Sequence, residues 1–241
     1  MFYFGIPSYK RSKEQLTLKY LKALGYNKNQ IIISTQTQED YLLYKNLYDN
    51  DAMIIFKDGQ CVSDNRNNIL LALPTGTQIV MLDDDIKALQ ILSGGKLKDI
   101  TTKQELDLII NDAFDYAIKH NARIWGVYPV SNPFFMKRTI DNRNIVIGCV
   151  MGLINNFIFD KKFRTKEDYE LCCREMRNGH NCIRFNYLTA NAKHKTNAGG
   201  CKDDWKYEIN KRCADLLIGR YPEMIKRNSK KLDEVRYVGR K

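Results

Sequence analysis

The sequence IVMLDDD at residues 79–85 guides the interpretation of the whole chain. Its four apolar residues predict a buried strand, and the three aspartates stand where that strand ends. In an open α/β sheet, ligands bind at the carboxyl ends of the strands. Asp83 and Asp85 would point to the same side if the strand geometry continues. Two such carboxylates need a proton or a cation between them, and Mg²⁺ or Mn²⁺ would suit because both bind carboxylate and phosphate oxygens.

A second interpretation of the same aspartates needs no ligand. Acidic residues often cap a helix and occupy its first turn, where free backbone N–H groups are available. If a helix began at Ile86, the three aspartates would serve it in this way. These residues taken alone leave both interpretations open.

Upstream of the aspartates, short apolar runs alternate with amphipathic segments. Strands are predicted at residues 2–6, 31–33, 53–56 and 79–82, and helices at 12–24, 39–48 and 65–73. Ser12 with Gln15 forms a possible capping box, Gly25 would end the first helix, and Asp64 would cap the third. The alternation predicts an α/β fold with a Rossmann-like, mostly parallel central sheet and helices on both faces.

Downstream, the clearest helix covers residues 102–120, where Thr102 and Glu105 form a capping box before an apolar stripe. Further predicted elements are a strand at 124–128, a polar and aromatic loop at 129–144, a strand at 145–153, a helix at 167–178 and a strand at 182–185. No repeat or low-complexity linker divides the chain. We therefore expect one α/β domain over residues 1–200, with a basic, mostly helical extension over 201–241 packed on it.

The composition is that of a globular protein with a strong basic excess. Of the 241 residues, 44% are hydrophobic and 28% are charged, and the net charge is +11. This charge favours a polyanionic partner such as nucleic acid, although a solvated surface would also account for it. No transmembrane segment, signal peptide or obligate protein partner is evident, so we expect a cytoplasmic location. The seven cysteines show no CxxC spacing and are expected to be free thiols.

Two further groups of residues bear on chemistry. Glu167 and Asp168 follow Thr165, a good N-cap residue, so both would lie in the first turn of a helix. There they would either stabilise the helix end or hold a carboxylate that takes a proton from a hydroxyl group. His194 lies between two lysines and is by itself typical of a surface residue. It becomes a candidate metal ligand only if the aspartates hold a metal.

Taken in order, these motifs resemble those of GT-A glycosyltransferases of the large inverting family-2 type. The matching segments are IPSYKR at 6–11, Gly59 with Arg66 and Asn67, the strand and aspartates at 79–85, the Glu-Asp helix start at 167–171 with Arg174 and Gly179, and His194. Each motif alone is common, but five of them in the same order are specific. The resemblance implies a single GT-A domain with a nucleotide-sugar donor.

The resemblance also implies a role for each matching residue. The pocket for the nucleotide base would be formed by Pro7, Ser8, Tyr9 and Arg11. The rest of the nucleotide would be contacted by Arg66, Asp83 and Asp84. The Mn²⁺ or Mg²⁺ ion would be held by Asp83, Asp85 and His194, although the triple aspartate leaves open which pair binds it. Asp168 would be the general base, assisted by Glu167. Gly148 and Gly152 would either let the backbone pass close to the donor sugar or mark a bulge.

More narrowly, the chain resembles phage glycosyltransferases associated with DNA-base hydroxylases. The segments that carry this resemblance are IPSYKRS at 6–12, LDDDI at 82–86 and the Lys-His-Lys stretch that leads to Gly-Gly-Cys at 199–201. It implies a UDP-sugar donor, with glucose as the sugar, a hydroxymethylated pyrimidine in DNA as the acceptor, and the host cytoplasm as the location. Four aromatic residues near the loop at 129–144 would either stack on an extruded base or pack in the protein: Trp125, Tyr128, Phe134 and Phe135.

Three alternatives to a DNA-modifying glycosyltransferase stay open. They are a glycosyltransferase with a glycan, lipid or protein acceptor, a non-catalytic nucleic-acid-binding protein on the same scaffold, and a nucleotidyltransferase.

Overall fold

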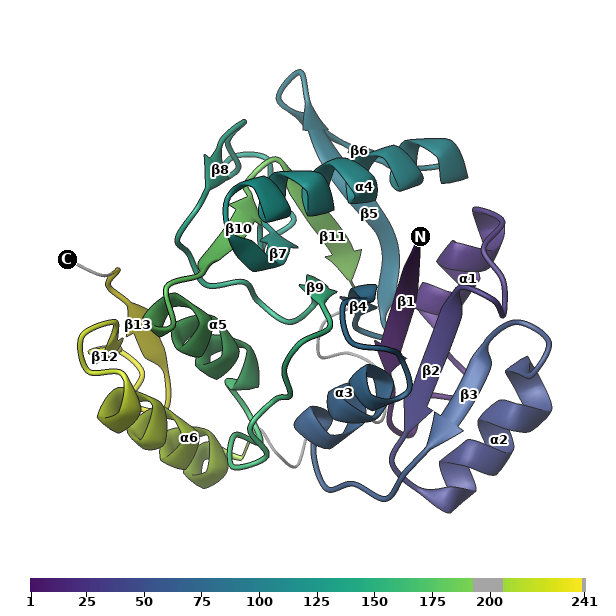
Figure 1. Cartoon of the computed structure of the whole chain (residues 1–241), viewed down its shortest axis with the longest axis horizontal. Coiled ribbons are helices and arrows are strands. Elements are labelled where there is room, and N and C mark those ends of the chain that lie inside the picture. The colour runs from purple at the N-terminus through teal and green to yellow at the C-terminus, as the bar shows by residue number, and fades with distance from the viewer. Residues whose placement is uncertain (193–205, 240–241) are drawn as a thin grey trace.

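The computed structural model describes residues 1–192 and 206–239 of the chain. The strands of its main sheet are, in chain order, β1 (Phe2–Pro7), β2 (Ile31–Thr35), β3 (Met53–Phe56), β4 (Gln78–Leu82), β7 (Ala122–Val127), β8 (Ile140–Asp141), β9 (Val150–Ile154) and β10 (Asn181–Phe185). In space the order is β3-β2-β1-β4-β9-β7-β10-β8 (Figure 1). The sequence-predicted strands therefore all belong to one sheet.

Strand direction fixes which ends meet. β1 pairs in parallel with β2 and β4, and β2 pairs in parallel with β3. β9 is antiparallel to both β4 and β7, so β7 runs in the same direction as β4. β10 is parallel to β7, and the short β8 is antiparallel to β10. This confirms the predicted mostly parallel sheet, and it places the carboxyl ends of β1, β4 and β7 at one edge.

Helices cover both faces of this sheet. Those of the described residues are α1 (Leu16–Ala23), α2 (Gln38–Tyr48), α3 (Val62–Leu71), α4 (Lys103–Lys119), α5 (Glu167–Arg177) and α6 (Tyr207–Arg220). One apolar core contains side chains of α1, α2 and α4, and the other contains side chains of α3, α5 and α6. In β4, Val80 faces the first core and Met81 the second. This two-sided burial explains the unbroken apolar run before the aspartates.

Two smaller sheets were not predicted. β5 (Ile86–Ser93) is the middle strand of a three-stranded antiparallel sheet, between β6 (Lys96–Asp99) and β11 (Leu188–Ala192). A hairpin of β12 (Ile225–Arg227) and β13 (Val235–Tyr237) follows α6. Both α6 and α5 pack in the second core. Because a strand follows the three aspartates directly, they do not cap a helix at Ile86, and that interpretation is wrong.

Several predicted element ends are also wrong. The first helix begins at Leu16, not Ser12, and Gln15 makes no capping hydrogen bond because its side chain turns into the protein. The third begins at Val62, so Asp64 lies in its first turn. The strand predicted at 145–153 begins only at Val150. By contrast, the Thr102 hydroxyl accepts a hydrogen bond from Glu105 N, as predicted.

Two further expectations, on membrane-spanning helices and on the cysteines, can be checked on the described residues. No helix within residues 1–192 and 206–239 is long and apolar enough to cross a membrane. The six cysteines of these ranges are buried and free, as expected of reduced thiols.

Candidate active site

The three aspartates form a fixed turn between the two sheets, which we call the acidic turn (Asp83–Asp85). The Thr17 hydroxyl donates to the carbonyl oxygen of Asp83 at 2.5 Å and accepts from the backbone N–H of Ile86 at 3.0 Å. The backbone N–H of Asp83 donates to the carbonyl oxygen of Cys149 at 3.0 Å. Thr17 therefore ties α1 to the turn, a role that the sequence analysis did not assign to it.

Asp84 points into the protein. Its carboxylate accepts hydrogen bonds from Arg11 Nη1 and, at 2.5 Å, from Ser8 Oγ. Burial raises the pKa of Asp84, and Arg11 opposes this shift. The same Ser8 hydroxyl lies 2.7 Å from Tyr44 Oη and accepts from Gln15 Nε2 at 2.6 Å. Asp84 thus belongs to a buried network in which both of its oxygens are already bonded.

Asp83 and Asp85 are the members of the turn that remain for a ligand. Asp85 is buried, and its Oδ2 lies 3.3 Å from Arg11 Nη1. Its Oδ1 is buried and has no hydrogen-bond partner among the described residues. The side chain of Asp83 is 38% exposed. Loss of surrounding water raises the pKa of Asp83 to about 7, and the charges of Asp85 and Asp84 add to this while Arg66 opposes it.

Arg66 of α3 connects the acidic turn to the second pair of predicted carboxylates. Its side chain is only 4% exposed, and Nη2 lies 3.5 Å from Asp83 Oδ1. Nη1 lies 3.6 Å from Glu167 Oε1 at the start of α5. Nη2 also donates to the carbonyl oxygen of Gly148 at 2.9 Å. One buried guanidinium therefore holds together the motifs at 66, 83 and 167, which are far apart in the chain.

The two carboxylates at the start of α5 differ in their surroundings. Glu167 is buried, and burial raises its pKa to about 7 while Arg66 opposes the shift. Asp168 is only partly buried. Its Oδ2 accepts from Gly148 N at 2.9 Å and its Oδ1 from Tyr169 N at 2.8 Å. Asp168 is thus held in place by the backbone at the surface of the site.

The predicted N-cap of this helix is wrong. The capping position is Lys166, with a φ of 63° and no side-chain capping bond. The Thr165 hydroxyl instead donates a hydrogen bond to Oδ1 of Asn210 on α6, at 3.0 Å.

Two glycines make room for large side chains. A Cβ atom on Gly148 would lie 2.4 Å from both terminal nitrogens of Arg66. A Cβ atom on Gly152 would lie 1.9 Å from Cε2 of Trp125, which is a core residue with 2% exposure. Packing of these two side chains therefore accounts for the missing Cβ atom at both positions.

The polar first half of α3 carries a signal that the sequence analysis missed. Residues 63–68 are all polar and all buried. Asn65 Nδ2 donates to the carbonyl oxygen of Ser8 at 3.0 Å, and Asn65 Oδ1 accepts from Ser34 Oγ at 2.7 Å. Asn65 thereby joins the ends of β1 and β2 beside Arg66. A run of polar residues inside a helix, next to a predicted sheet edge, is the pattern that would have found it.

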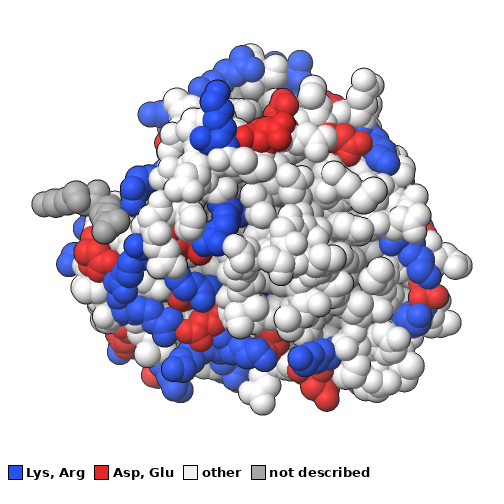
Figure 2. All heavy atoms as spheres, viewed as in Figure 1, with Lys and Arg blue, Asp and Glu red and all other residues white. Residues whose placement is uncertain are grey.

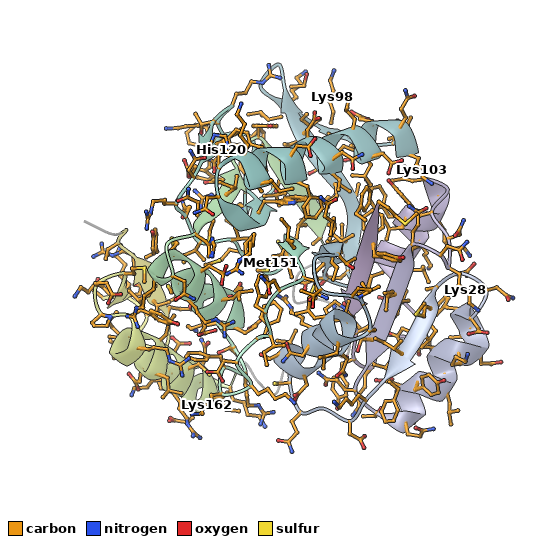
Figure 3. The ribbon with its side chains drawn as sticks, viewed as in Figure 1. Lys28, Lys98, Lys103, His120, Met151 and Lys162 are labelled. Carbon is orange, nitrogen blue, oxygen red and sulfur yellow. The ribbon has the colours of Figure 1, made fainter. Side chains whose placement is uncertain are left out.

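The remaining predicted residues are distributed as follows. Pro7 ends β1 and is buried, whereas Tyr9 is partly exposed with Lys10 Nζ 5.0 Å from its ring centroid. His194 lies outside the described residues. His120 and His180 precede β7 and β10, at the sheet edge opposite the acidic turn (Figure 3 labels His120). Neither of these two histidines lies near the acidic turn.

The acidic turn suits a divalent cation only in part. Asp83 and Asp85 offer carboxylate oxygens, and the unbonded Oδ1 of Asp85 is the kind of atom that a cation would satisfy. Within residues 1–192 and 206–239, however, no three His, Cys, Asp or Glu side chains form a metal-binding group. The two aspartates therefore fit a metal whose other ligands come from a bound phosphate, water or His194.

The strand order of the main sheet, with carboxylates at the carboxyl end of β4 and at the start of α5, is that of the GT-A glycosyltransferase fold. Comparison with known families agrees: the profile of the TET-associated glycosyltransferases matches residues 4–200. The chain therefore belongs to this family of glycosyltransferases. No curated protein matches the sequence.

Solved structures show the same fold at low sequence identity. The chain is similar to a mannosyltransferase from Pyrobaculum calidifontis in complex with GDP-Man and Mn²⁺, with a TM-score of 0.57 and 10% identity over 92% of this chain and 63% of that protein. It is also similar to a mycobacterial protein, with a TM-score of 0.54 and 6% identity over 99% of this chain and 83% of that one. The chain thus spans less than two thirds of the mannosyltransferase.

Proposed function

We propose that this glycosyltransferase moves a sugar, glucose, from a UDP-sugar to the hydroxymethyl group of a modified pyrimidine in DNA. The observation that carries the proposal is the position of Arg66 between Asp83 and Glu167. This arginine brings the carboxylates proposed for the donor next to those proposed for the acceptor. An arrangement of this kind suits transfer between two substrates better than binding alone.

The donor would lie along the carboxyl ends of β1 and β4. Tyr9, which is partly exposed, would face the nucleotide base, while Pro7 and Ser8 shape the loop behind it. Arg66 would lie near the phosphates, where a buried guanidinium is a strong partner for anionic oxygens. Arg11 and Asp84 are bonded to each other, so we assign them the task of holding this loop on the acidic turn.

A divalent cation, Mn²⁺ or Mg²⁺, would be held by Asp83 and Asp85, with His194 as the further candidate ligand. When bound, such an ion stabilises the negative charge that develops on a departing nucleoside diphosphate. The mannosyltransferase of similar fold was solved with GDP-Man and Mn²⁺, which supports this part of the proposal. The unbonded Oδ1 of Asp85 supports it independently.

Asp168 would act as the general base. The acceptor oxygen forms a bond to the anomeric carbon of the sugar, its proton passes to Asp168, and the bond from that carbon to the diphosphate breaks. Asp168 is the more exposed carboxylate of the pair, and two backbone N–H groups orient it. Glu167 is buried against Arg66 and would position that arginine rather than touch the acceptor.

DNA is proposed as the acceptor on two grounds. The family is described as TET-associated, which agrees with the resemblance to glycosyltransferases associated with DNA-base hydroxylases, and the net charge of +11 suits a phosphate-rich partner. Figure 2 shows Lys and Arg side chains gathered at the lower left, over α6 and its surroundings, among fewer acidic ones.

The test is a transfer assay. The protein is incubated with UDP-glucose, Mn²⁺ and DNA that contains 5-hydroxymethyluracil or 5-hydroxymethylcytosine, and the digested nucleosides are analysed by mass spectrometry. We expect a hexose mass gain on one base with wild-type protein and none with Asp168→Asn. Donor hydrolysis without a DNA product would keep the transferase and point to a glycan, lipid or protein acceptor. Neither binding nor turnover of any nucleotide sugar would contradict the catalytic proposal.

A further inference from the structure

The loop after β7 leaves the sheet beside the acidic turn. Gly126 of β7 is in register with Met151 of β9, and Leu82 of β4 is in register with Val150. β7 therefore ends level with Leu82, two strands away. With about 4.8 Å between neighbouring strands, the loop begins about 10 Å from the acidic turn. The segment that follows, residues 129–139, leads to β8 at the outer edge of the sheet (Figure 1).

Hydrogen bonds hold this segment at both ends. Near its start, Ser131 Oγ donates to Gln90 Oε1 at 2.6 Å, and Gln90 lies on β5, the strand that leaves the acidic turn. Near its end, the backbone N–H of Lys137 donates to the carbonyl oxygen of Asn186 at 3.3 Å, and Thr139 O accepts from Asn186 N at 3.0 Å. The segment is thus attached to elements that frame the site.

Between these anchors the chain makes a tight turn that exposes two phenylalanines. Asn132 Oδ1 accepts from Phe134 N at 3.0 Å, and Asn132 O accepts from Phe135 N at 3.2 Å. Met136 is buried and anchors the turn. Phe134 is 85% exposed and Phe135 55% exposed, with their rings edge to face at 5.1 Å. An ordered turn that places two adjacent aromatic rings in solvent indicates a binding surface.

The charge around these rings indicates which partner they fit. Lys137 and Arg138 follow after Met136, both are exposed, and neither forms an ion pair with the described residues. The nearest acidic residue in the sequence, Asp141, pairs with Arg184 instead. No acidic residue occurs between positions 129 and 140. Exposed aromatic rings beside unpaired cations are the features that bind exposed bases and their phosphates, because every base has a face on which a ring can stack. This one-sided positive charge suits a phosphate-bearing partner better than a protein surface of mixed charge.

We propose that Phe134, Phe135, Lys137 and Arg138 form a DNA-docking platform, which holds the nucleotides that flank the modified base. This inference rests on the proposed DNA acceptor. It also revises the expectation for the four aromatic residues. Trp125 is in the core, and Tyr128 is partly buried with Arg184 Cζ 5.6 Å from its ring centroid, so only the two phenylalanines are free to stack.

The experiment measures binding of a fluorescein-labelled single-stranded oligonucleotide with one 5-hydroxymethyluracil, by anisotropy, to the full-length protein. Transfer to the same oligonucleotide is measured in parallel. Because both rings are exposed, the Phe134→Ala/Phe135→Ala variant should fold normally. We expect its Kd and its KM for DNA to rise about tenfold or more, with kcat at saturating DNA and the rate of donor hydrolysis unchanged. Lys137→Gln/Arg138→Gln should weaken binding and reduce its salt dependence.

Two matched controls distinguish the platform from general effects. Leu108→Ala removes an exposed apolar side chain from α4, and Lys19→Gln/Lys119→Gln removes two exposed cations, one from α1 and one from α4, away from the basic surface over α6. Both should leave Kd within about twofold of wild type.

Three results would overturn the platform. One is wild-type affinity and KM in the phenylalanine variant. Another is an equal loss of affinity in both variants that remove two cations, which would mean diffuse charge binding. The third is a change in oligomeric state by light scattering with unchanged DNA affinity, which would mean that the rings meet a second copy of the chain. These results differ from failure of the proposed function itself, in which the wild-type protein neither binds nor modifies DNA.

Discussion

Replacing Gly148 with alanine tests whether the position of Arg66 organises the site. The new Cβ atom would lie 2.4 Å from both terminal nitrogens of Arg66 and 2.8 Å from Cζ, whereas ordinary contacts begin at 3.4 Å. The guanidinium would have to move by about 1 Å. That movement weakens its bonds to Gly148 O, Asp83 and Glu167 at once. Overpacking of this kind costs about 1–3 kcal/mol of stability, and a displacement of about 1 Å in a site can cost about 100-fold in rate.

The assay is a double-mutant cycle. Urea unfolding is measured for wild type, Gly148→Ala, Arg66→Ala and the double variant, and turnover of the nucleotide sugar is measured alongside. If the alanine acts by displacing Arg66, it should cost less than about 0.5 kcal/mol once Arg66 is absent. Gly219→Ala on α6 is the control, because nothing lies within 4 Å of its new Cβ atom. It should leave turnover unchanged and stabilise the helix by up to about 1 kcal/mol. If Gly148→Ala still cost about 1–3 kcal/mol of stability in the Arg66→Ala background, the reasoning would be refuted.

Three further substitutions test individual parts of the site. Asp168→Asn should reduce transfer at least about 1000-fold while donor affinity changes less than about threefold, because only the proton acceptor is lost; equal losses of turnover and donor binding, measured by calorimetry, would contradict the base assignment. Asp85→Asn should remove the Mn²⁺ dependence of donor binding, and chelation of the metal should weaken donor binding to wild type but not to this variant; a variant that keeps full metal dependence would contradict the ligand assignment. Ser8→Ala should lower the free energy of urea unfolding by about 1–3 kcal/mol, because it leaves Asp84, Tyr44 and Gln15 without a buried hydrogen-bond partner. Ser229→Ala, at an exposed position, should be nearly neutral, and equal stability of the two variants would contradict the buried network.

Seven of the eight strands of the main sheet could be predicted because their pattern is local, whereas the two-residue β8 lies in the segment predicted as a loop. Most of the predicted apolar runs are buried on both faces, so their composition alone marks them as strands. The strand β5 could not be found in this way. One partner, β11, lies about 100 residues further along the chain and is invisible in the local sequence. The other, β6, forms a hairpin with β5 across Gly94 and Gly95, a local turn signal that the sequence analysis did not use. Helix starts failed for a related reason, since the side chains of Gln15 and Thr165 bond to distant residues instead of capping their helices.

The candidate site was predicted as an ordered set of motifs, and its geometry required the structure. Nothing in the local sequence says that Arg66 meets Gly148, 82 residues away. Nor does the triple aspartate reveal that its middle member turns inward toward Ser8, which leaves Asp83 and Asp85 for a ligand. For Gly148 and Gly152 the sequence left open a close approach to the donor sugar or a bulge, because glycine permits both. The structure shows that the groups approaching are the side chains of Arg66 and Trp125.

The charges of the site explain why a cation should enter with the donor. Two guanidinium groups of the described residues lie among five carboxylates: Arg11 and Arg66 among Asp83, Asp84, Asp85, Glu167 and Asp168. The pKa of Asp83 and that of Glu167 are raised to about 7, although Arg66 favours their charged forms. Burial is the main cause of both shifts, and even with Asp83 and Glu167 protonated three carboxylates remain against two guanidinium groups, so the site holds more negative charge than its arginines balance. A nucleoside diphosphate would add to that excess, so we expect it to bind well only when positive charge accompanies it. Asp83 and Asp85, one exposed and the other with an unbonded oxygen, are where that charge would be received.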